Sequence, residues 1–198
     1  MVKADATWVK VAVDPLCPWS WRVAQWLKEV RGVRSLGVEW ALLSLEYLNR
    51  ERPDHPMMSR FRSNRAAMRL MHMTRGRGGN LKLEELYFAL GEAIHERGED
   101  PQEEGVLVEV LGKVGLPQKW ALEALQDRDL DQELWGLYAE LCTTGAFGVP
   151  TIFFGPSMTP YYGPVISKVP RGEQAGELWD HVAGLACHEY FYELKRPR

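Results

Sequence analysis

The stretch DPLCPWSW (residues 14–21) places a cysteine, Cys17, between a predicted strand and a predicted helix. The strand is WVKVAV (8–13), in which apolar and polar residues alternate before the segment becomes apolar and Asp14-Pro15 ends it. Pro18 stands at the first helical position, where its fixed φ and missing N–H are favourable, and apolar residues then recur at helical spacing. We therefore expect Cys17 at the N-terminus of a helix.

The start of a helix favours a thiolate, because unpaired backbone N–H groups and the positive end of the helix dipole face the sulfur. This position predicts a lowered pKa for Cys17, and hence a nucleophile at neutral pH. The alternative is that Cys17 is a small buried apolar side chain. The Cys-Pro-Trp-Ser sequence at a strand–helix junction favours the nucleophile, with Pro18 and Trp19 as further members of the active-site motif.

GVPTIFFG (148–155) predicts a second short strand, which a proline opens. In a thioredoxin-like fold a cis proline lies at this place, against the active-site sulfur, and exposes the preceding backbone to a bound thiol substrate. We therefore expect Val149 and Pro150 to belong to the same site as Cys17.

The remaining patterns complete the predicted order of elements: a β-α-β unit, then a block of helices, then a β-β-α unit. VEWALLSL (38–45) predicts another strand, and from about Pro56 to Ala146 nearly every segment has a helical pattern, interrupted by TRGRGGN (74–80). YYGPVI (161–166) is expected to pair beside the GVPTIFFG strand, and an amphipathic helix follows Pro170.

This order predicts an α/β protein with a thioredoxin-like fold and an inserted all-helical domain. The thioredoxin-like domain is expected to comprise residues 1–55 and 147–198. The inserted domain, called the helical insert below, comprises residues 56–146.

DPLCPW (14–19) and GVPTI (148–152) resemble the DsbA-like branch of the thioredoxin superfamily. Four further segments are similar to the mycothiol-dependent nitroreductase group of actinobacteria: SLEYLNRER (44–52), AIHERG (93–98), GPVISKVPRGEQAGELWD (163–180) and FYELKR (191–196). The resemblance implies a cytosolic oxidoreductase that uses mycothiol, a low-molecular-weight thiol, as co-substrate. Its substrates would be disulfides or nitro-aromatic compounds.

Ser20 departs from that group, which commonly carries CPWC. A second cysteine releases a trapped mixed disulfide by internal attack, whereas a serine only donates a hydrogen bond to the Cys17 thiolate. Cys142 and Cys187 are expected to be structural. The sequence therefore predicts monothiol chemistry, in which an external thiol resolves the Cys17 intermediate.

Three further residues are candidates for substrate binding. Trp19 shares the apolar stripe of the first helix, so Trp21 is expected to point elsewhere and to stack on a flat substrate, with simple packing as the alternative. Asn49 follows the second strand, and His95 lies at the rim of an apolar helix face, where it would donate a proton or hydrogen bond. The alternatives for these two are a helix-capping Asn and a surface His.

Composition narrows the function classes. The net charge of -3 argues against nucleic acid as a partner, and the arginine-rich run over 60–77 is expected to be a solvated helix face. Three scattered cysteines exclude a disulfide scaffold, the histidines lack zinc-ligand spacing, and no segment is apolar enough for a signal peptide or membrane span. We expect a cytoplasmic protein with no metal and no bound cofactor; a homodimer is one option for its oligomeric state.

Two other functions stay open. A kappa-class-like glutathione transferase or isomerase shares the inserted helical architecture, but uses a serine in place of the first cysteine. A redox-inactive thioredoxin-like binding module would have lost its chemistry with the second cysteine, and would show an ordinary Cys17 pKa of about 8.5.

Overall fold

The computed structural model describes residues 8–155 and 159–197. Its sheet has four strands in the order β2-β1-β3-β4. These are β1 (Trp8–Val13), β2 (Gly37–Leu42), β3 (Thr151–Phe154) and β4 (Thr159–Tyr162). β2 runs parallel to β1, whereas β3 runs antiparallel to both of its neighbours. Thr151 pairs with Ala12, so the start of β3 lies at the end of the sheet where β1 leads to Cys17.

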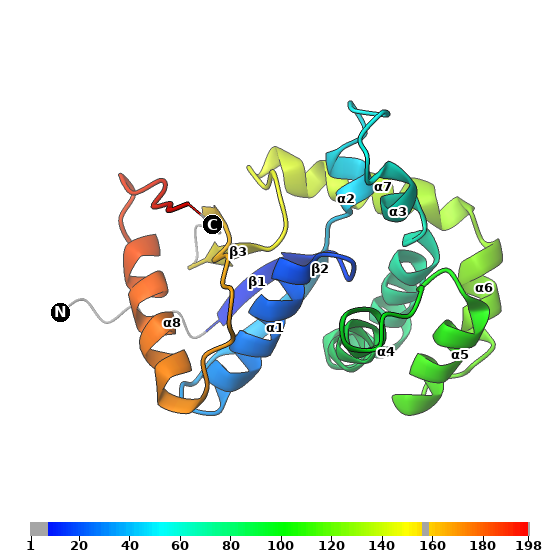
Figure 1. Ribbon diagram of the computed structural model, residues 1–198, viewed down its shortest axis with the longest axis horizontal. Helices are drawn as coiled ribbons and strands as arrows, with labels where there is room; N and C mark the ends of the chain where they lie inside the picture. The colour runs from blue at the N-terminus through cyan, green and yellow to red at the C-terminus, as the bar shows by residue number, and fades with distance from the viewer. Residues whose placement is uncertain (1–7, 156–158, 198) are drawn as a thin grey trace.

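Two helices of the thioredoxin-like part lie side by side, as Figure 1 shows: α1 (Pro18–Arg31) and α8 (Gly172–Ala186). The rings of Trp26 and Trp179 join them, with centroids 5.9 Å apart. The Trp26 Nε1–H also donates to the Ala175 carbonyl at 3.0 Å, which pairs the polar atom of a fully buried indole. The predicted β-α-β and β-β-α halves, and with them the thioredoxin-like fold class, are confirmed.

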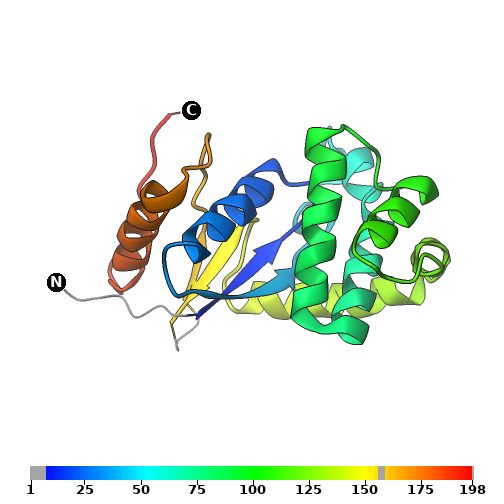
Figure 2. The ribbon, with the colours of Figure 1, turned by 90° about the horizontal axis from the view of Figure 1, so that it is seen from below.

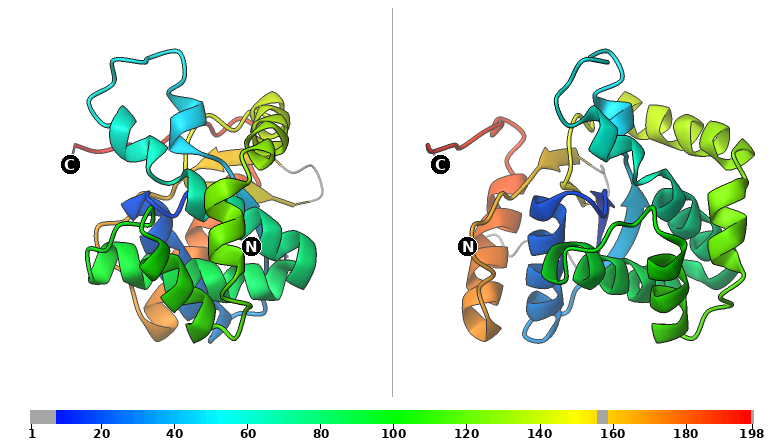
Figure 3. Two further views of the ribbon diagram at one scale, coloured as in Figure 1. Left: turned by 90° about the vertical axis from the view of Figure 1, so that its right-hand side faces the viewer. Right: turned by 45° about the vertical axis from the view of Figure 1, so that its right-hand side comes forward.

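The helical insert gathers on the side of α1 opposite α8 (Figure 2). Residues 56–146 form no strand and contain α3 (Met58–Arg62), α4 (Arg65–Gly91), the π-helical turn η1 (Glu92–Glu96), α5 (Glu104–Lys113), α6 (Trp120–Gln126) and α7 (Asp129–Thr143). A short helix, α2 (Leu45–Leu48), connects β2 to this group. α4 packs on β2, and α5, α6 and α7 pack against α4 (Figure 3). Buried apolar side chains of the sheet and the insert form one continuous core.

The expected interruption of the helices at TRGRGGN (74–80) is reduced to a kink in α4. Only Gly79 leaves the helical region, with a φ of 75° that glycine adopts without a Cβ clash. After this kink the Asn80 side chain reaches the outer edge of β2, where it accepts from the Trp40 N–H and donates to the Val38 carbonyl, both at 2.8 Å. The insert thereby covers one edge of the sheet.

The fourth strand lies earlier in the sequence than YYGPVI (161–166) predicts. β4 ends at Tyr162 because Gly163 has a φ of 104° and Pro164 has no N–H to donate to a ladder. The Gly163 N–H instead donates to the Pro150 carbonyl at 2.8 Å. The segment after β4 therefore stays beside the start of β3. No helix in the described ranges is long and apolar enough to cross a membrane.

Candidate active site

Cys17 caps α1 with its own sulfur, because the Ser20 N–H donates to Sγ at 3.5 Å. The Cys17 N–H donates to the Asp14 carbonyl at 3.0 Å and closes the turn after β1. The thiol itself donates to the Val149 carbonyl at 3.4 Å. The start of α1 and the approach to β3 therefore meet at this sulfur, and Cys17 is only 3% exposed.

The other motif residues surround the cysteine. The Val149–Pro150 peptide bond is cis, as the sequence predicts. Ser20 is fully buried, Pro18 is exposed and Trp19 is half-buried. The side chains at the start of α1 thus form one site with the residues that precede β3.

The pKa of Cys17 differs from the expectation. Burial raises the pKa of the thiol above its ordinary value, and the negative charge of Asp14 adds to this effect. The polar groups at the start of α1, namely the Ser20 hydroxyl and the backbone N–H groups of Ser20 and Trp19, lower the pKa without cancelling the effect of burial. The prediction of a lowered pKa is therefore wrong for the free protein. Helix position is visible in a sequence, whereas desolvation depends on the tertiary structure.

Asp14 is a buried part of the site that the sequence patterns identified only as a strand end. Its carboxylate accepts from the Leu16 N–H (2.8 Å), the Leu45 N–H (2.7 Å) and the Asn64 side-chain amide (2.8 Å). These donors belong to the Cys17 turn, the start of α2 and the start of α4. Burial raises the pKa of Asp14 to about 6. The sequence did contain a signal for this residue, since Asp14 is a carboxylate at the end of an apolar strand and shortly before Cys17.

Trp21 does not offer an open ring face for a flat substrate, as had been expected, since it is 6% exposed. Its ring stacks on His95 with 6.1 Å between ring centres, and it meets Tyr87 and Phe88 edge-on. The reason is that both sides of α1 are covered: Trp26 faces α8 and Trp21 faces α4. Packing, the alternative for this residue, is what the structure shows.

His95 lies beside the Cys17 turn rather than on the surface. Its Nε2 is 2.8 Å from the Pro15 carbonyl, an acceptor, so the proton is on Nε2. Burial lowers the pKa of His95, so the ring is neutral at neutral pH. His95 belongs to η1, and π-helical turns of this kind are frequent at functional sites. The structure thus connects the end of α4 directly to the active-site turn.

Asn49 serves as the C-cap of α2, which is the alternative interpretation of this residue. Its side-chain amide donates to the Leu45 carbonyl at 2.8 Å. Leu45 in turn donates its N–H to Asp14, so Asn49 stabilises the short helix that holds this carboxylate.

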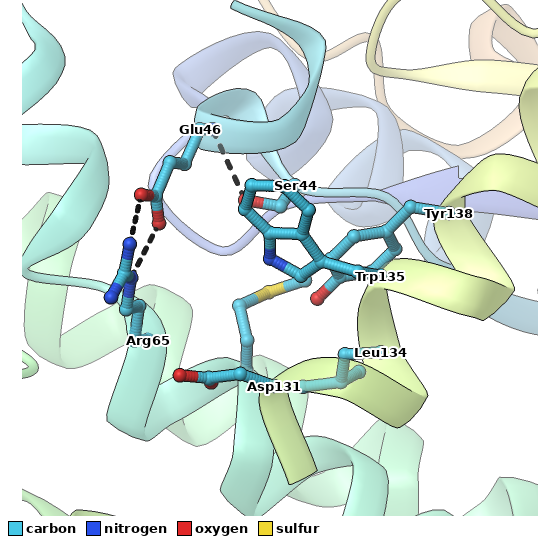
Figure 4. Close-up of a pocket in the computed structure, with 8 residues that line it drawn as sticks. Ser44, Glu46, Arg65, Asp131, Leu134, Trp135 and Tyr138 are labelled. Carbon is cyan, nitrogen blue, oxygen red and sulfur yellow. Dashed lines mark hydrogen bonds and ion pairs between the residues drawn. The ribbon is translucent and has the colours of Figure 1, made fainter. Parts of the chain in front are cut away.

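A small pocket between α2, α4 and α7 contains none of the predicted site residues (Figure 4). It is lined by Ser44, Glu46, Arg65, Met68, Asp131, Leu134, Trp135 and Tyr138. Its charged groups are already paired, Glu46 with Arg65 and Asp131 with Arg69, which is 5% exposed. Arg69 is thus buried, whereas Arg62, Arg65, Arg75 and Arg77 of the arginine run are exposed and pair with acidic side chains. Most of the run therefore forms the expected solvated face, and Arg69 is the exception. Within the described residues no cluster of three or more His, Cys, Asp or Glu side chains forms a metal site.

Comparison with protein families identifies the group to which this site belongs. Residues 16–196 match the model of the Rv2466c-like family, described as mycothiol-dependent nitroreductase Rv2466c. The chain belongs to this family. A member of the Mycobacterium tuberculosis proteome, described as uncharacterized protein Rv2286c, is 30% identical over 193 residues, which is 97% of this chain and 83% of that protein.

Two solved structures share the fold of this Rv2466c-like protein. One is 2-hydroxychromene-2-carboxylate isomerase, with a TM-score of 0.62, 15% identity, and coverage of 91% of this chain and 96% of the isomerase. The other is the cytosolic disulfide reductase DsbM from Pseudomonas aeruginosa, with a TM-score of 0.60, 15% identity, and coverage of 90% and 99%. The DsbA-like, thioredoxin-like fold predicted from the sequence is thereby confirmed.

Proposed function

We propose that this chain is a monothiol reductase, in which Cys17 is the single nucleophile and a low-molecular-weight thiol such as mycothiol is the co-substrate. Its substrates are disulfides or nitro-aromatic and other electrophilic compounds. The observation that carries the proposal is the arrangement at the start of α1: the Cys17 sulfur lies 3.4 Å from the Val149 carbonyl, and the Ser20 hydroxyl stands where the second thiol of a CPWC motif would be.

The chemistry needs two exchanges. In the first, the Cys17 thiolate attacks a disulfide R–S–S–R′, forms a Cys17–S–S–R bond and releases R′–S⁻, which takes a proton from water. In the second, a thiolate of the external thiol attacks the R sulfur, and Cys17 leaves as a thiolate. These two exchanges at Cys17 leave a mixed disulfide of R and the external thiol, and a second external thiolate then displaces R–S⁻ from it and forms the external thiol's own disulfide. Over all the exchanges the substrate disulfide gains two electrons and the two external thiols lose them. Cys17, Cys142 and Cys187 are all free thiols, and in this proposal the electrons come from the external thiol.

The surroundings of Cys17 suggest how a substrate is held. The guanidinium of Arg22 lies 5.1 Å from the centre of the half-buried Trp19 ring, and its NH1 donates to the Ile166 carbonyl at 3.4 Å. Trp19 and the exposed Pro18 form the surface next to the sulfur. We assign to them the contact with a flat or thiol-bearing substrate, in place of the buried Trp21.

His95 and Asn49 act on the protein rather than on the substrate in this proposal. The neutral His95 ring holds the Pro15 carbonyl of the active-site turn, and Asn49 holds the helix that carries Leu45. A reducing cytoplasm suits the reaction, because it keeps Cys17 and the external thiol reduced. Two solved forms of the fold support a small thiol as partner: DsbM is described as a cytosolic disulfide reductase, and it has also been solved with GSH.

The decisive experiment is intact mass spectrometry after incubation with the mixed disulfide of mycothiol. We expect one mycothiol adduct, which Cys142→Ser and Cys187→Ser retain and Cys17→Ser loses completely. Turnover of a nitro-aromatic compound or of a disulfide should require added mycothiol and should disappear in Cys17→Ser. Activity that survives in Cys17→Ser would refute the proposal.

Ser20→Cys is the matched gain-of-function variant. It restores a dithiol, so the external thiol should no longer be needed to release the first mixed disulfide, and no mycothiol adduct should accumulate. The rival functions give other results. A redox-inactive binding module forms no adduct in either protein, and an isomerase or transferase turns over a substrate without oxidising any thiol.

A further inference from the structure

Phe147 and Tyr162 form a pair of exposed aromatic rings close to the active site. Their ring centroids are 5.6 Å apart, with 34° between the ring planes. Phe147 is 73% exposed and Tyr162 is 41% exposed. Apolar side chains scattered singly are common on a protein surface, whereas large rings that touch each other in solvent form a candidate binding surface.

The loop that precedes β3 joins this aromatic pair to the Cys17 sulfur. Phe147 lies two residues before Val149, so their Cα atoms are at most about 7.6 Å apart. The Val149 carbonyl in turn accepts from the Cys17 thiol at 3.4 Å. On the neighbouring strand, Tyr162 pairs with Thr151, the second residue after Val149. The two rings and the sulfur therefore border the same short stretch of backbone.

Gly148 allows the Tyr162 ring to lie directly on this loop. A Cβ at position 148 would be 2.8 Å from the Cδ2 and Cε2 atoms of the ring, which is closer than a side chain can approach. The residue after Tyr162 is also held, because the Gly163 N–H donates to the Pro150 carbonyl at 2.8 Å. The ring of Tyr162 thus has a defined place beside the loop of the active site.

The aromatic pair has the size and chemistry of a small-molecule contact. Two aromatic side chains bury at most about 500 Å², whereas a stable protein–protein interface buries about 800 Å² on each partner. Phe147 has no polar side-chain atom, and Tyr162 adds one hydroxyl. A flat aromatic group suits this surface, because a sugar would find too few partners here for its several hydroxyls.

Stacking on these rings favours an electron-poor aromatic group. The faces of the Phe147 and Tyr162 rings are negative, and a nitro group or a ring nitrogen draws electron density out of the ring that carries it. On the α1 side of the sulfur, the Arg22 guanidinium already lies 5.1 Å from the centre of the Trp19 ring. Trp19 therefore shares its ring with a cation, and the aromatic pair adds ring surface on the β3 side.

We propose that Phe147 and Tyr162 bind the aromatic group of an electron-poor substrate while its reacting atom meets Cys17, and so determine a preference for aromatic over aliphatic substrates. The inference rests on Cys17 as the nucleophile of the proposed function, and it names the class of substrate at that site. With an aryl disulfide, the Cys17 thiolate forms a bond to one sulfur, the substrate S–S bond breaks, and the other sulfur leaves as an aryl thiolate. The two rings hold the aryl group and exchange no atoms or electrons with it.

The test compares two neutral disulfides: dipyridyl disulfide, which has electron-poor rings, and hydroxyethyl disulfide, which has none. The rate constant of Cys17 with each is measured without mycothiol in a Cys142→Ser/Cys187→Ser background, where Cys17 is the one remaining thiol. Phe147→Leu and Tyr162→Leu each replace a ring by an aliphatic side chain. We expect each to slow the reaction with dipyridyl disulfide roughly three- to tenfold, the effect of losing one aromatic contact. The rate with hydroxyethyl disulfide should stay the same.

Trp8→Leu is the matched control. Trp8 is also an exposed aromatic residue, but it begins β1 at the other end of the sheet, about 16 Å from Val13. We expect this variant to react with both disulfides as the parent protein does. Phe147→Trp is the rescue variant, because it keeps an aromatic ring and should keep the rate with dipyridyl disulfide. Alkylation of Cys17 by iodoacetamide, which has no ring, should be equal in all these variants.

Four results would overturn the inference. Three concern the rates: no loss with dipyridyl disulfide in Phe147→Leu and Tyr162→Leu, an equal loss with hydroxyethyl disulfide, or an equal loss in Trp8→Leu. The fourth is a dimer in size-exclusion chromatography that Phe147→Leu dissociates, because the aromatic pair would then be an interface between two copies of the chain.

This inference and the proposed function fail separately, because the exchange with either disulfide needs no mycothiol. A rate that depends on the two rings, without a mycothiol adduct, would refute the proposed function and leave this inference standing. A mycothiol adduct on Cys17 without any dependence on the rings would do the reverse.

Discussion

Helix α8 packs on α1 through Trp26, whose indole meets Trp179 and whose N–H is paired with the Ala175 carbonyl. Helix α4 packs on the other side of α1 through Trp21, which is stacked on a histidine and lies over Gly91. Both contacts bury a tryptophan. They differ in what surrounds the ring: the α8 side of α1 serves packing alone, whereas the α4 side also holds titratable groups near the active-site turn.

The flank at α8 is bordered by exposed ion pairs. Arg34 donates to Glu173 and Asp180, and Arg171 donates to Glu29. The α4 flank instead contains titratable groups: Asp14 and Tyr87 are buried, and the half-buried His95 lies beside the Cys17 turn. The titratable groups near the active-site turn therefore lie on the α4 flank of α1 and not on the α8 flank.

The largest expected effect is a change of the unfolding free energy with pH, which comes from the Asp14 carboxyl on the α4 flank. The pKa of Asp14 is raised to about 6 in the folded protein, against about 4 in an unfolded chain. The folded state therefore holds more protons between these values, and Asp14 makes the protein less stable as pH rises from about 4 to about 6, by roughly 3 kcal/mol in total. Urea unfolding across this range measures the change.

Asp14→Asn isolates this contribution, because its side chain does not titrate. The difference in unfolding free energy between the variant and the wild type should move by roughly 3 kcal/mol in favour of the variant from about pH 4 to neutral pH. Its absolute value also contains the hydrogen bonds that the amide loses, which are the same at every pH. A difference independent of pH would show that the pKa of Asp14 is not raised, and the proposed contrast between the two flanks of α1 would then be wrong.

The next largest effect is the loss of stability when a glycine is replaced by alanine, which we expect to differ between the two flanks of α1. At Gly91 an added Cβ would overlap the indole ring of Trp21, which is enclosed and cannot move away. Gly91→Ala should cost about 2 kcal/mol by thermal or urea unfolding, and should alter Cys17 alkylation by shifting α4. At Gly176 on α8, the Cβ would lie 2.7 Å from the guanidinium carbon of Arg34, the end of a flexible side chain. Gly176→Ala should therefore cost less than about 1 kcal/mol.

Gly136→Ala is the control for helix propensity. A Cβ at this exposed position of α7 meets no atom within 4 Å, so the variant should be stabilised by about 0.5–1 kcal/mol. Equal costs at Gly91 and Gly176 would remove the distinction between a rigid and an adaptable flank.

The smallest effect belongs to the ion pairs of α8. Arg34 holds the pKa of Glu173 and of Asp180 below the usual range, so their stabilisation is present at neutral pH and is lost in acid, opposite in sign to Asp14. These carboxylates are exposed, so Arg34→Gln should lower the Tm by no more than about 2 °C at low salt. At high salt the difference should vanish. A larger loss that persists at high salt would indicate a packing role for Arg34.

Local signals predicted the sheet domain well. Alternating apolar residues marked β1, a proline at the first helical position marked α1, and a proline-opened apolar run marked β3, which then met Cys17 at the predicted place. The end of β4 was misplaced because a positive φ at Gly163 ends the pairing, and sequence periodicity does not report such a torsion.

The side chains of the site were harder to predict, because their roles depend on contacts between distant segments. Trp21 was misplaced because α1 is covered on two sides, and a helix with two buried faces gives no single stripe. The burial that raises the pKa of Cys17 comes from the packed core around it. Asp14 went unnoticed because two of its three donors, Leu45 and Asn64, are brought to it only by the fold.

The side chain of Asn80 has a consequence for how this protein behaves at high concentration. By pairing with the Trp40 N–H and the Val38 carbonyl, it occupies the backbone groups through which β2 would otherwise recruit a strand from another molecule. At the opposite edge β4 is four residues long and contains Pro160, which lacks a donor. Both borders of the sheet are thus protected against edge-to-edge aggregation, so the insert also helps to keep the folded chains apart.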